Sequence, residues 1–170
     1  MKLSAALSLA FVVLAVSPAT AALAQPGPSL ADTLGFIQGK LLARGDLSWV
    51  VTRSDASGGE PHLDRVNRVQ TDAAACALTI NYTVLIQGQQ QSYDDTIQFG
   101  KISDVQLATW AHLATSTSVT FQTQPEVWTV ELFFPNTTAA INFFDQSMAD
   151  RVAKAVSHAA QLCGGLKSAQ

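Results

Sequence analysis

The chain has 170 residues, of which 48% are hydrophobic and 14% charged, and its formal net charge at pH 7 is −3. This length favours one globular domain. Because no basic run is present, the composition argues against nucleic acid as a partner.

Residues 1–24 have the pattern of a signal peptide. Lys2 gives a positive start, residues 5–16 form a short apolar run, and Ala22-Leu23-Ala24 is a small-x-small cleavage site. The run is shorter than the about 20 apolar residues that a membrane span needs. We therefore expect cleavage after Ala24, a periplasmic or secreted protein, and no membrane anchor after cleavage. A retained anchor is the alternative.

The next residues, 25–29, are predicted to form a stiff leader, residues 30–166 a single α+β domain, and residues 167–170 a tail. A first helix is expected from Leu30 to Ala43, because apolar residues recur at helical spacing and Gly45 follows. Gly35 and Gly39 weaken this helix by about 1 kcal/mol each relative to alanine, unless they mark close packing on a sheet.

After Gly45 the hydrophobic period changes from 3.6 to 2, which predicts strands. We expect seven or eight of them, at residues 47–52, 62–71, 76–87, 92–99, 102–110, 118–122, 127–134 and 139–144. Their order is mostly that of consecutive hairpins with no helix between strands, and this order favours an antiparallel sheet.

The segment from Asp145 to Gly165 is predicted to be an amphipathic helix that caps the sheet. Asp145 and Ser147 are two capping options, and Gly164-Gly165 provides the end. The expected buried arc consists of Met148, Val152, Ala155, Val156, Ala159, Leu162 and Cys163.

Together these elements predict an α+β fold with an N-terminal helix, a strongly bent antiparallel sheet or partial barrel of seven or eight strands, and a C-terminal capping helix. This order of elements is analogous to that of pleckstrin-homology-like (PH-like) domains. An analogy of element order does not specify a function.

The sequence ADRVAKAVSHAAQLCGG, at residues 149–165, resembles the closing segment of small exported, largely uncharacterised bacterial proteins. In those proteins an N-terminal helix and a β region precede an Arg-Val-Ala-Lys-Ala, His-Ala, Leu-Cys-Gly-Gly helix. The likeness is specific over residues 149–165 and loose over residues 30–144. It implies a fold and an exported address, and it implies no chemistry.

The chain has two cysteines, Cys76 and Cys163. Cys76 opens a predicted strand on the same face as Leu78 and Ile80, and Cys163 lies on the apolar arc of the last helix. Two thiols directed into one core of an exported chain suggest a disulfide. Two separate buried thiols are the alternative.

The sequence shows no catalytic or metal-binding motif. Its three histidines lack metal-ligand spacing, and a G-x-S-x-G nucleophile elbow is absent. Asp95 of the Asp94-Asp95 pair falls on an apolar strand face, which predicts either a sheet edge or an ion pair with Arg65 or Arg68. A catalytic carboxylate is a further alternative.

Trp110 and His112 are the candidates for contact with a ligand or partner. An exposed tryptophan close to the mouth of a bent sheet would suit such a contact. The sequence therefore predicts an exported, non-catalytic binding or interaction domain without cofactor or metal, whose partner is an unknown protein or a small apolar ligand. The alternatives are a periplasmic carrier of a small apolar ligand and a hydrolase whose residues form no recognisable motif.

Overall fold

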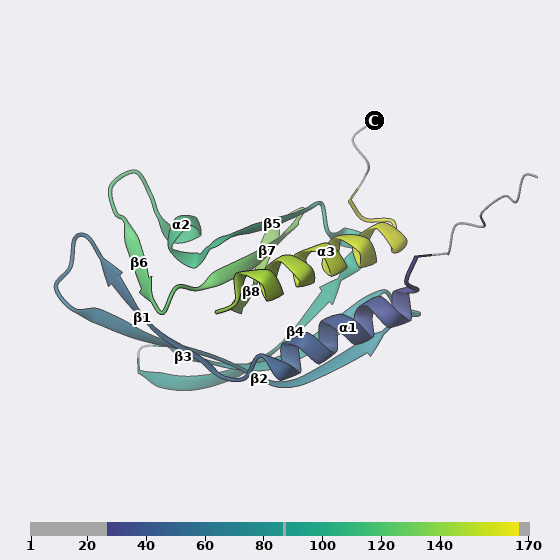
Figure 1. Ribbon diagram of the computed structural model, residues 1–170, viewed down its shortest axis with the longest axis horizontal. Coiled ribbons are helices and arrows are strands. Elements are labelled where there is room, and N and C mark those ends of the chain that lie inside the picture. Colours follow the sequence, from purple (N-terminus) through teal and green to yellow (C-terminus); the bar gives the residue numbers. More distant parts are fainter. Residues whose placement is uncertain (1–26, 87, 167–170) are drawn as a thin grey trace, which may run out of the picture.

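The computed structural model describes residues 27–86 and 88–166 (Figure 1). The predicted signal peptide, the first two leader residues and the tail lie outside these ranges. Export and cleavage after Ala24 therefore stay predictions. Among the described helices, none is both long and apolar enough to cross a membrane.

The described chain contains three α-helices, one 3-10 helix and eight strands. In order they are α1 (Leu30–Ala43), β1 (Leu47–Arg53), β2 (Gly59–Asp72), β3 (Ala77–Ile86), β4 (Gln89–Gln98), η1 (Phe99–Lys101), β5 (Asp104–Thr109), α2 (Trp110–Ala114), β6 (Phe121–Gln124), β7 (Trp128–Phe134), β8 (Thr137–Phe143) and α3 (Gln146–Leu162).

The strands form two antiparallel sheets, one with the order β4-β3-β2-β1-β6 and one with the order β5-β7-β8. The predicted α+β class, the antiparallel pairing and the number of strands are confirmed. The strands divide between two sheets instead of forming one bent sheet, and they do not close into a barrel. The division arises because η1 interrupts the chain between β4 and β5, and because β6 returns to pair with β1.

The first helix has the predicted bounds. Ser29 caps it in a capping box with Asp32, and a face that includes Leu34, Ile37 and Leu41 is buried. Gly35 and Gly39 are exposed, and a Cβ atom built on either would meet no atom within 4 Å. Close packing at these glycines was therefore the wrong alternative.

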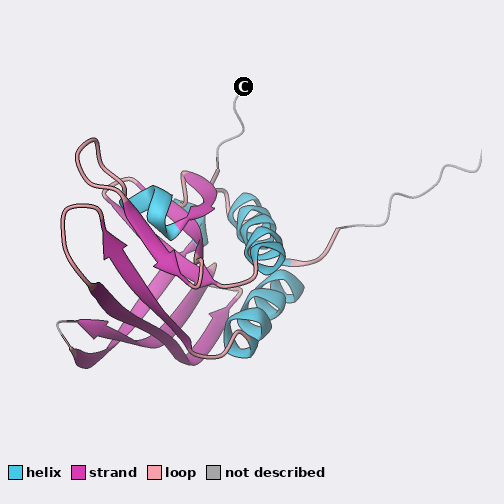
Figure 2. Ribbon diagram, turned by 60° about the vertical axis from the view of Figure 1, so that its left-hand side comes forward, coloured by secondary structure: helices cyan, strands magenta, loops and turns pink. Residues whose placement is uncertain are grey.

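The last helix lies beside α1 (Figure 2). Each of the two helices covers a different sheet. Helix α1 contacts β2, whereas α3 contacts β5, β7 and β8. The main core lies between the helices and the two sheets. Its α3 contribution is Ala149, Val152, Val156, Ala159 and Ala160.

The predicted buried position of Leu162 is wrong, since this side chain is 50% exposed. Helix α3 ends there, and Gly164 adopts a left-handed conformation (φ +78°) that reverses the chain. After the reversal the Leu166 amide donates to the Ile102 carbonyl, and Leu166 packs against the core instead. Asp145 is the cap, accepting from the Met148 amide.

The predicted disulfide between Cys76 and Cys163 is confirmed, with Cα atoms 5.9 Å apart. Cys76 does not open the strand as expected. It lies in the preceding turn with φ +52°, and β3 starts at Ala77. The bond links the five-stranded sheet to the end of the helix that covers the three-stranded sheet.

A smaller core lies under β1 and is formed by Leu47, Trp49, Val51 and Val127. Trp110 and Phe121 pack against it. The strand expected to run to Trp110 ends at Thr109, because the Thr109 hydroxyl accepts from the His112 amide and starts α2.

Candidate binding groove between the sheets

A groove separates the outer strands of the two sheets. β4 is the last strand of the five-stranded sheet and β8 the last of the three-stranded sheet, so each has one unpaired edge. The groove has an inner chamber of about 290 Å³ and an outer chamber of about 590 Å³, which share Asp95 and Ile97 of β4 and Thr138 and Ala139 of β8. We call the two chambers together the intersheet groove.

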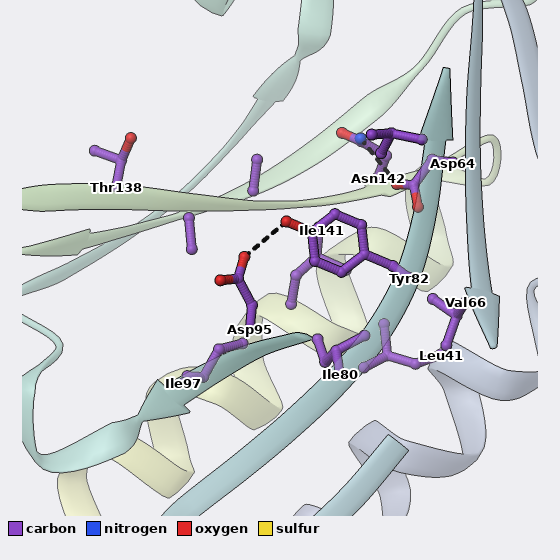
Figure 3. A pocket seen from close by; sticks show the side chains of 13 residues that line it. Leu41, Asp64, Val66, Ile80, Tyr82, Asp95, Ile97, Thr138, Ile141 and Asn142 are labelled. Carbon is purple, nitrogen blue, oxygen red and sulfur yellow. Dashed lines mark hydrogen bonds between the residues drawn. The ribbon is translucent and has the colours of Figure 1, made fainter. Parts of the chain in front are cut away.

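The inner chamber has an apolar floor. The side chains that form it are Leu41, Val66, Ile80, Ile97 and Ile141 (Figure 3). The pairing of β3 with β4 explains this floor, because it places Ile97 opposite Leu78 and Asp95 opposite Ile80. Alternate residues of both strands therefore face β8.

A hydrogen-bonded pair stands on the same face of these two strands. The Tyr82 hydroxyl donates to Asp95 Oδ2 at 2.9 Å (Figure 3). Burial, reinforced by the bond to Asp95, raises the pKa of Tyr82 to about 12. The phenol therefore stays protonated at neutral pH and remains a donor.

Asp95 occupies the edge position that the sequence predicted as one of two possibilities, since β4 is an edge strand. The other possibility, an ion pair with Arg65 or Arg68, is wrong. Arg65 pairs instead with Asp46 at 2.6 Å, and no salt bridge joins Asp95 to an arginine in the described part of the chain.

A buried polar network closes the opposite end of the chamber. Arg44 Nη2 donates to Asp64 Oδ1 at 2.6 Å, and the side chains of these residues are 5% and 12% exposed. Arg44 also donates to the Asn142 carbonyl, while the Asn142 side chain donates to Asp64 Oδ2 at 3.1 Å. Thr129 completes the network by donating to Asn142 Oδ1 at 2.9 Å.

The outer chamber is more polar. Its lining includes Lys101, Gln98 and Asn136, together with Pro135 at the turn between β7 and β8. The groove therefore changes from an apolar interior to a polar entrance. This gradient suits a ligand that has one apolar part and one polar part.

Neither Trp110 nor His112 lines the intersheet groove. Trp110 is half-buried, and its ring meets Phe121 edge-on at 5.9 Å between ring centres. His112 is exposed on α2. Whether either contacts a partner stays a prediction.

Sequence reasoning missed Tyr82 as a site residue, because the alternation along residues 76–87 places it on the apolar face with Leu78 and Ile80. The available signal was that Tyr82 and Asp95 lie on the inward faces of two strands joined by a hairpin. His62 was also missed. It stacks on Trp49 at 5.4 Å and meets the edge of Trp110 at 5.5 Å.

Residues 27–86 and 88–166 bring together no group of three or more histidine, cysteine or acidic side chains that would hold a metal ion. No protein-family model matches the chain, and no curated protein matches it.

Proposed function

We propose that this protein is an exported, non-catalytic binding domain and that the intersheet groove is its ligand site. The apolar part of a small ligand would occupy the inner chamber, and its polar part would lie toward the entrance. The observation that carries this proposal is a groove with an apolar floor, the Tyr82–Asp95 pair beside that floor, and a polar entrance.

The dimensions of the groove support a small ligand. Sites for small molecules commonly measure about 300–1,000 Å³ and combine apolar walls with a few polar groups. The inner chamber, at about 290 Å³, is at the lower end of that range, and the outer chamber adds further space.

The titratable side chains of the inner chamber support a binding role over a hydrolytic one. Asp64 is engaged by Arg44, and the pKa of Tyr82, at about 12, keeps its phenol from acting as a nucleophile at neutral pH. Asp95 is left as a lone carboxylate. A nucleophile and its general base would have to stand within hydrogen-bond reach of one another.

Export is part of the same proposal. Its support is the predicted signal peptide, the resemblance of residues 149–165 to exported bacterial proteins, and the Cys76–Cys163 disulfide, which is compatible with an oxidising compartment. We also keep the PH-like layout as a proposal, supported by antiparallel strands followed by a C-terminal helix on the sheet.

Ligand carriage is tested by mass spectrometry of protein purified without denaturation and incubated with an extract of its growth medium. We expect a bound small molecule that denaturing extraction releases. Ala139 is half-buried on β8 at the junction of the two chambers. The variant Ala139→Phe should therefore fill the groove and lose the ligand.

A matched control places the same side chain elsewhere. Ala74 is exposed in the turn before β3, so Ala74→Phe should retain the ligand. Equal retention by Ala139→Phe and the unaltered protein would refute the assignment of the groove, and so would a protein that takes up nothing from the extract.

Docking of a partner protein is the second candidate function. It is favoured by the unpaired edge of β4, a strand of ten residues that an added strand of another chain would extend. A partner captured through this edge should be lost when Thr96→Pro places a proline in β4, whereas binding of a small ligand does not depend on the backbone donors of the strand.

A further inference from the structure

The charges around the inner chamber point to a particular class of ligand, and this step rests on the proposed function. Two carboxylates line the chamber, those of Asp64 and Asp95. Arg44 neutralises Asp64 through two hydrogen bonds. The chamber therefore keeps one uncompensated negative charge, at Asp95.

Asp64 has little capacity left for a ligand. Its Oδ1 accepts from Arg44, and its Oδ2 accepts from both Arg44 and Asn142. A ligand that competed for these oxygens would leave the buried guanidinium without its partner, which is costly. The polar end at Asp64 is thus structural.

Asp95 has the opposite character. Among the described side chains it accepts from Tyr82 alone, through Oδ2, so that Oδ1 is open to a donor in the groove. The Tyr82 hydroxyl is already committed to this bond and fixes the orientation of the carboxylate. The free oxygen lies beside the apolar floor, because Ile97 is two residues further along the same face of β4.

We propose that the intersheet groove binds small apolar amines, with the ammonium group on Asp95 and the hydrocarbon part on Ile80, Ile97 and Ile141. An ammonium ion supplies several donors and a positive charge, and both complement a carboxylate with a free oxygen. A carboxylate ligand would meet like charge, and a neutral alcohol would gain the hydrogen bond without the charge. Lys101 lies in the outer chamber and does not line the inner one.

The test compares three probes of one shape: cyclohexylmethylamine, cyclohexylmethanol and cyclohexanecarboxylate. Each is titrated at neutral pH and low salt into the full chain with labelled backbone amides, and the chemical shifts of Tyr82, Ile97 and Ala139 are followed. We expect the amine to bind at least about threefold more tightly than the alcohol, and the carboxylate to bind least. The preference should shrink in high salt, because Asp95 is exposed to solvent.

Two variants test whether Asp95 causes the preference for the amine over the alcohol. Asp95→Asn keeps the shape of the side chain and should make amine and alcohol equal. Asp94 lies next in sequence but on the opposite face of β4, where Asn81 donates to it. Asp94→Asn should therefore leave the preference of the unaltered protein intact.

The outcomes separate the two proposals. Binding of amine and alcohol in the groove with equal affinity would overturn the amine assignment and leave the binding function standing. An amine preference that survives in Asp95→Asn would overturn it too. If none of the three probes shifts the groove resonances at millimolar concentration, the proposed ligand site itself is wrong.

Discussion

At the scale of single residues, His62 is a histidine held between two indole rings. It is half-buried against Trp49 and Trp110. Burial lowers its pKa below the ordinary value of 6.5, and the nearby charge of Glu60 opposes that shift in part. The folded protein therefore binds a proton at His62 less readily than the unfolded chain does.

This difference makes the stability depend on pH. Well above pH 6.5 the ring is neutral in both states, and its contribution is fully present. As the pH falls below that value the unfolded chain takes up the proton first, so the free energy of unfolding decreases. Urea unfolding at a series of pH values should show this decrease in the unaltered protein and a smaller one in His62→Gln. His112→Gln, at an exposed position, is the control, and an equal effect of both substitutions would contradict the assignment.

A second residue-scale prediction concerns the Arg44–Asp64 pair. Asp64→Leu would leave a buried guanidinium without its counter-ion, and we expect it to lower the free energy of unfolding by about 3–5 kcal/mol. Arg44→Met combined with Asp64→Leu should cost less than Asp64→Leu alone, because the stranded charge is gone. Denaturant unfolding of the two single variants and the double variant measures this coupling. Strictly additive losses would show that the two side chains do not depend on one another.

For the candidate site, the sequence predicted the positions of single residues better than the contacts between them. The pattern placed Asp95 on an inward face and allowed an edge position, which is correct. It did not reveal the hydrogen bond from Tyr82, since that bond depends on the register of β3 against β4. Side-chain alternation is a local property, whereas register joins residues distant in the sequence.

At the scale of elements, a glycine inside α1 and a glycine that follows α3 make contrasting predictions. Gly35 lies inside α1, and a Cβ atom there meets nothing within 4 Å. Gly35→Ala should raise the free energy of unfolding by about 0.5–1 kcal/mol, because alanine favours the helix. Gly165 follows α3, and a Cβ atom there would lie 2.5 Å from the Phe99 carbonyl oxygen and 3.0 Å from that of Ile102.

We therefore expect Gly165→Ala to destabilise the protein by about 1–3 kcal/mol, as overpacking does. The same substitution then has opposite signs at the two positions. Thermal unfolding followed by circular dichroism provides the comparison. A stabilising Gly165→Ala would mean that the chain after α3 does not pack on η1 as described.

The contrast between elements and their assembly explains what sequence could predict of the fold. The bounds of α1 and the approximate places of the strands follow from local periodicity and capping residues, such as Ser29 and Asp145. The division into two sheets does not follow from local periodicity, because it depends on β6 pairing with β1 across about 70 residues of chain. The prediction that Leu162 is buried fails for a related reason. A helical wheel does not show where along the helix the contact with the rest of the protein ends.

At the scale of the whole molecule, three features join the two sheets. The main core packs residues of both sheets against α1 and α3. The buried network connects Arg44 at the end of α1 and Asp64 of β2 to Asn142 of β8. The Cys76–Cys163 bond adds a covalent link. These three connections between the sheets lie at the helices and at the closed end of the inner chamber. The groove between β4 and β8 therefore stays open.

The disulfide carries the last prediction, because it spans 87 residues and so constrains the unfolded chain strongly. In the chain-entropy account, a loop of that length contributes about 4.5 kcal/mol. The variant Cys76→Ser/Cys163→Ser should lose stability of this order. Its unfolding should also depend more steeply on urea concentration, since an unfolded chain without the crosslink exposes more surface.

Chemical reduction of the unaltered protein should reproduce both changes, and alkylation of both thiols before reduction would contradict the bond. Because the constraint acts on the unfolded state, the amide spectrum of the folded variant should differ from that of the parent only in three places: the turn around residue 76, the neighbourhood of Gly100, which lies against Cys163, and the end of α3.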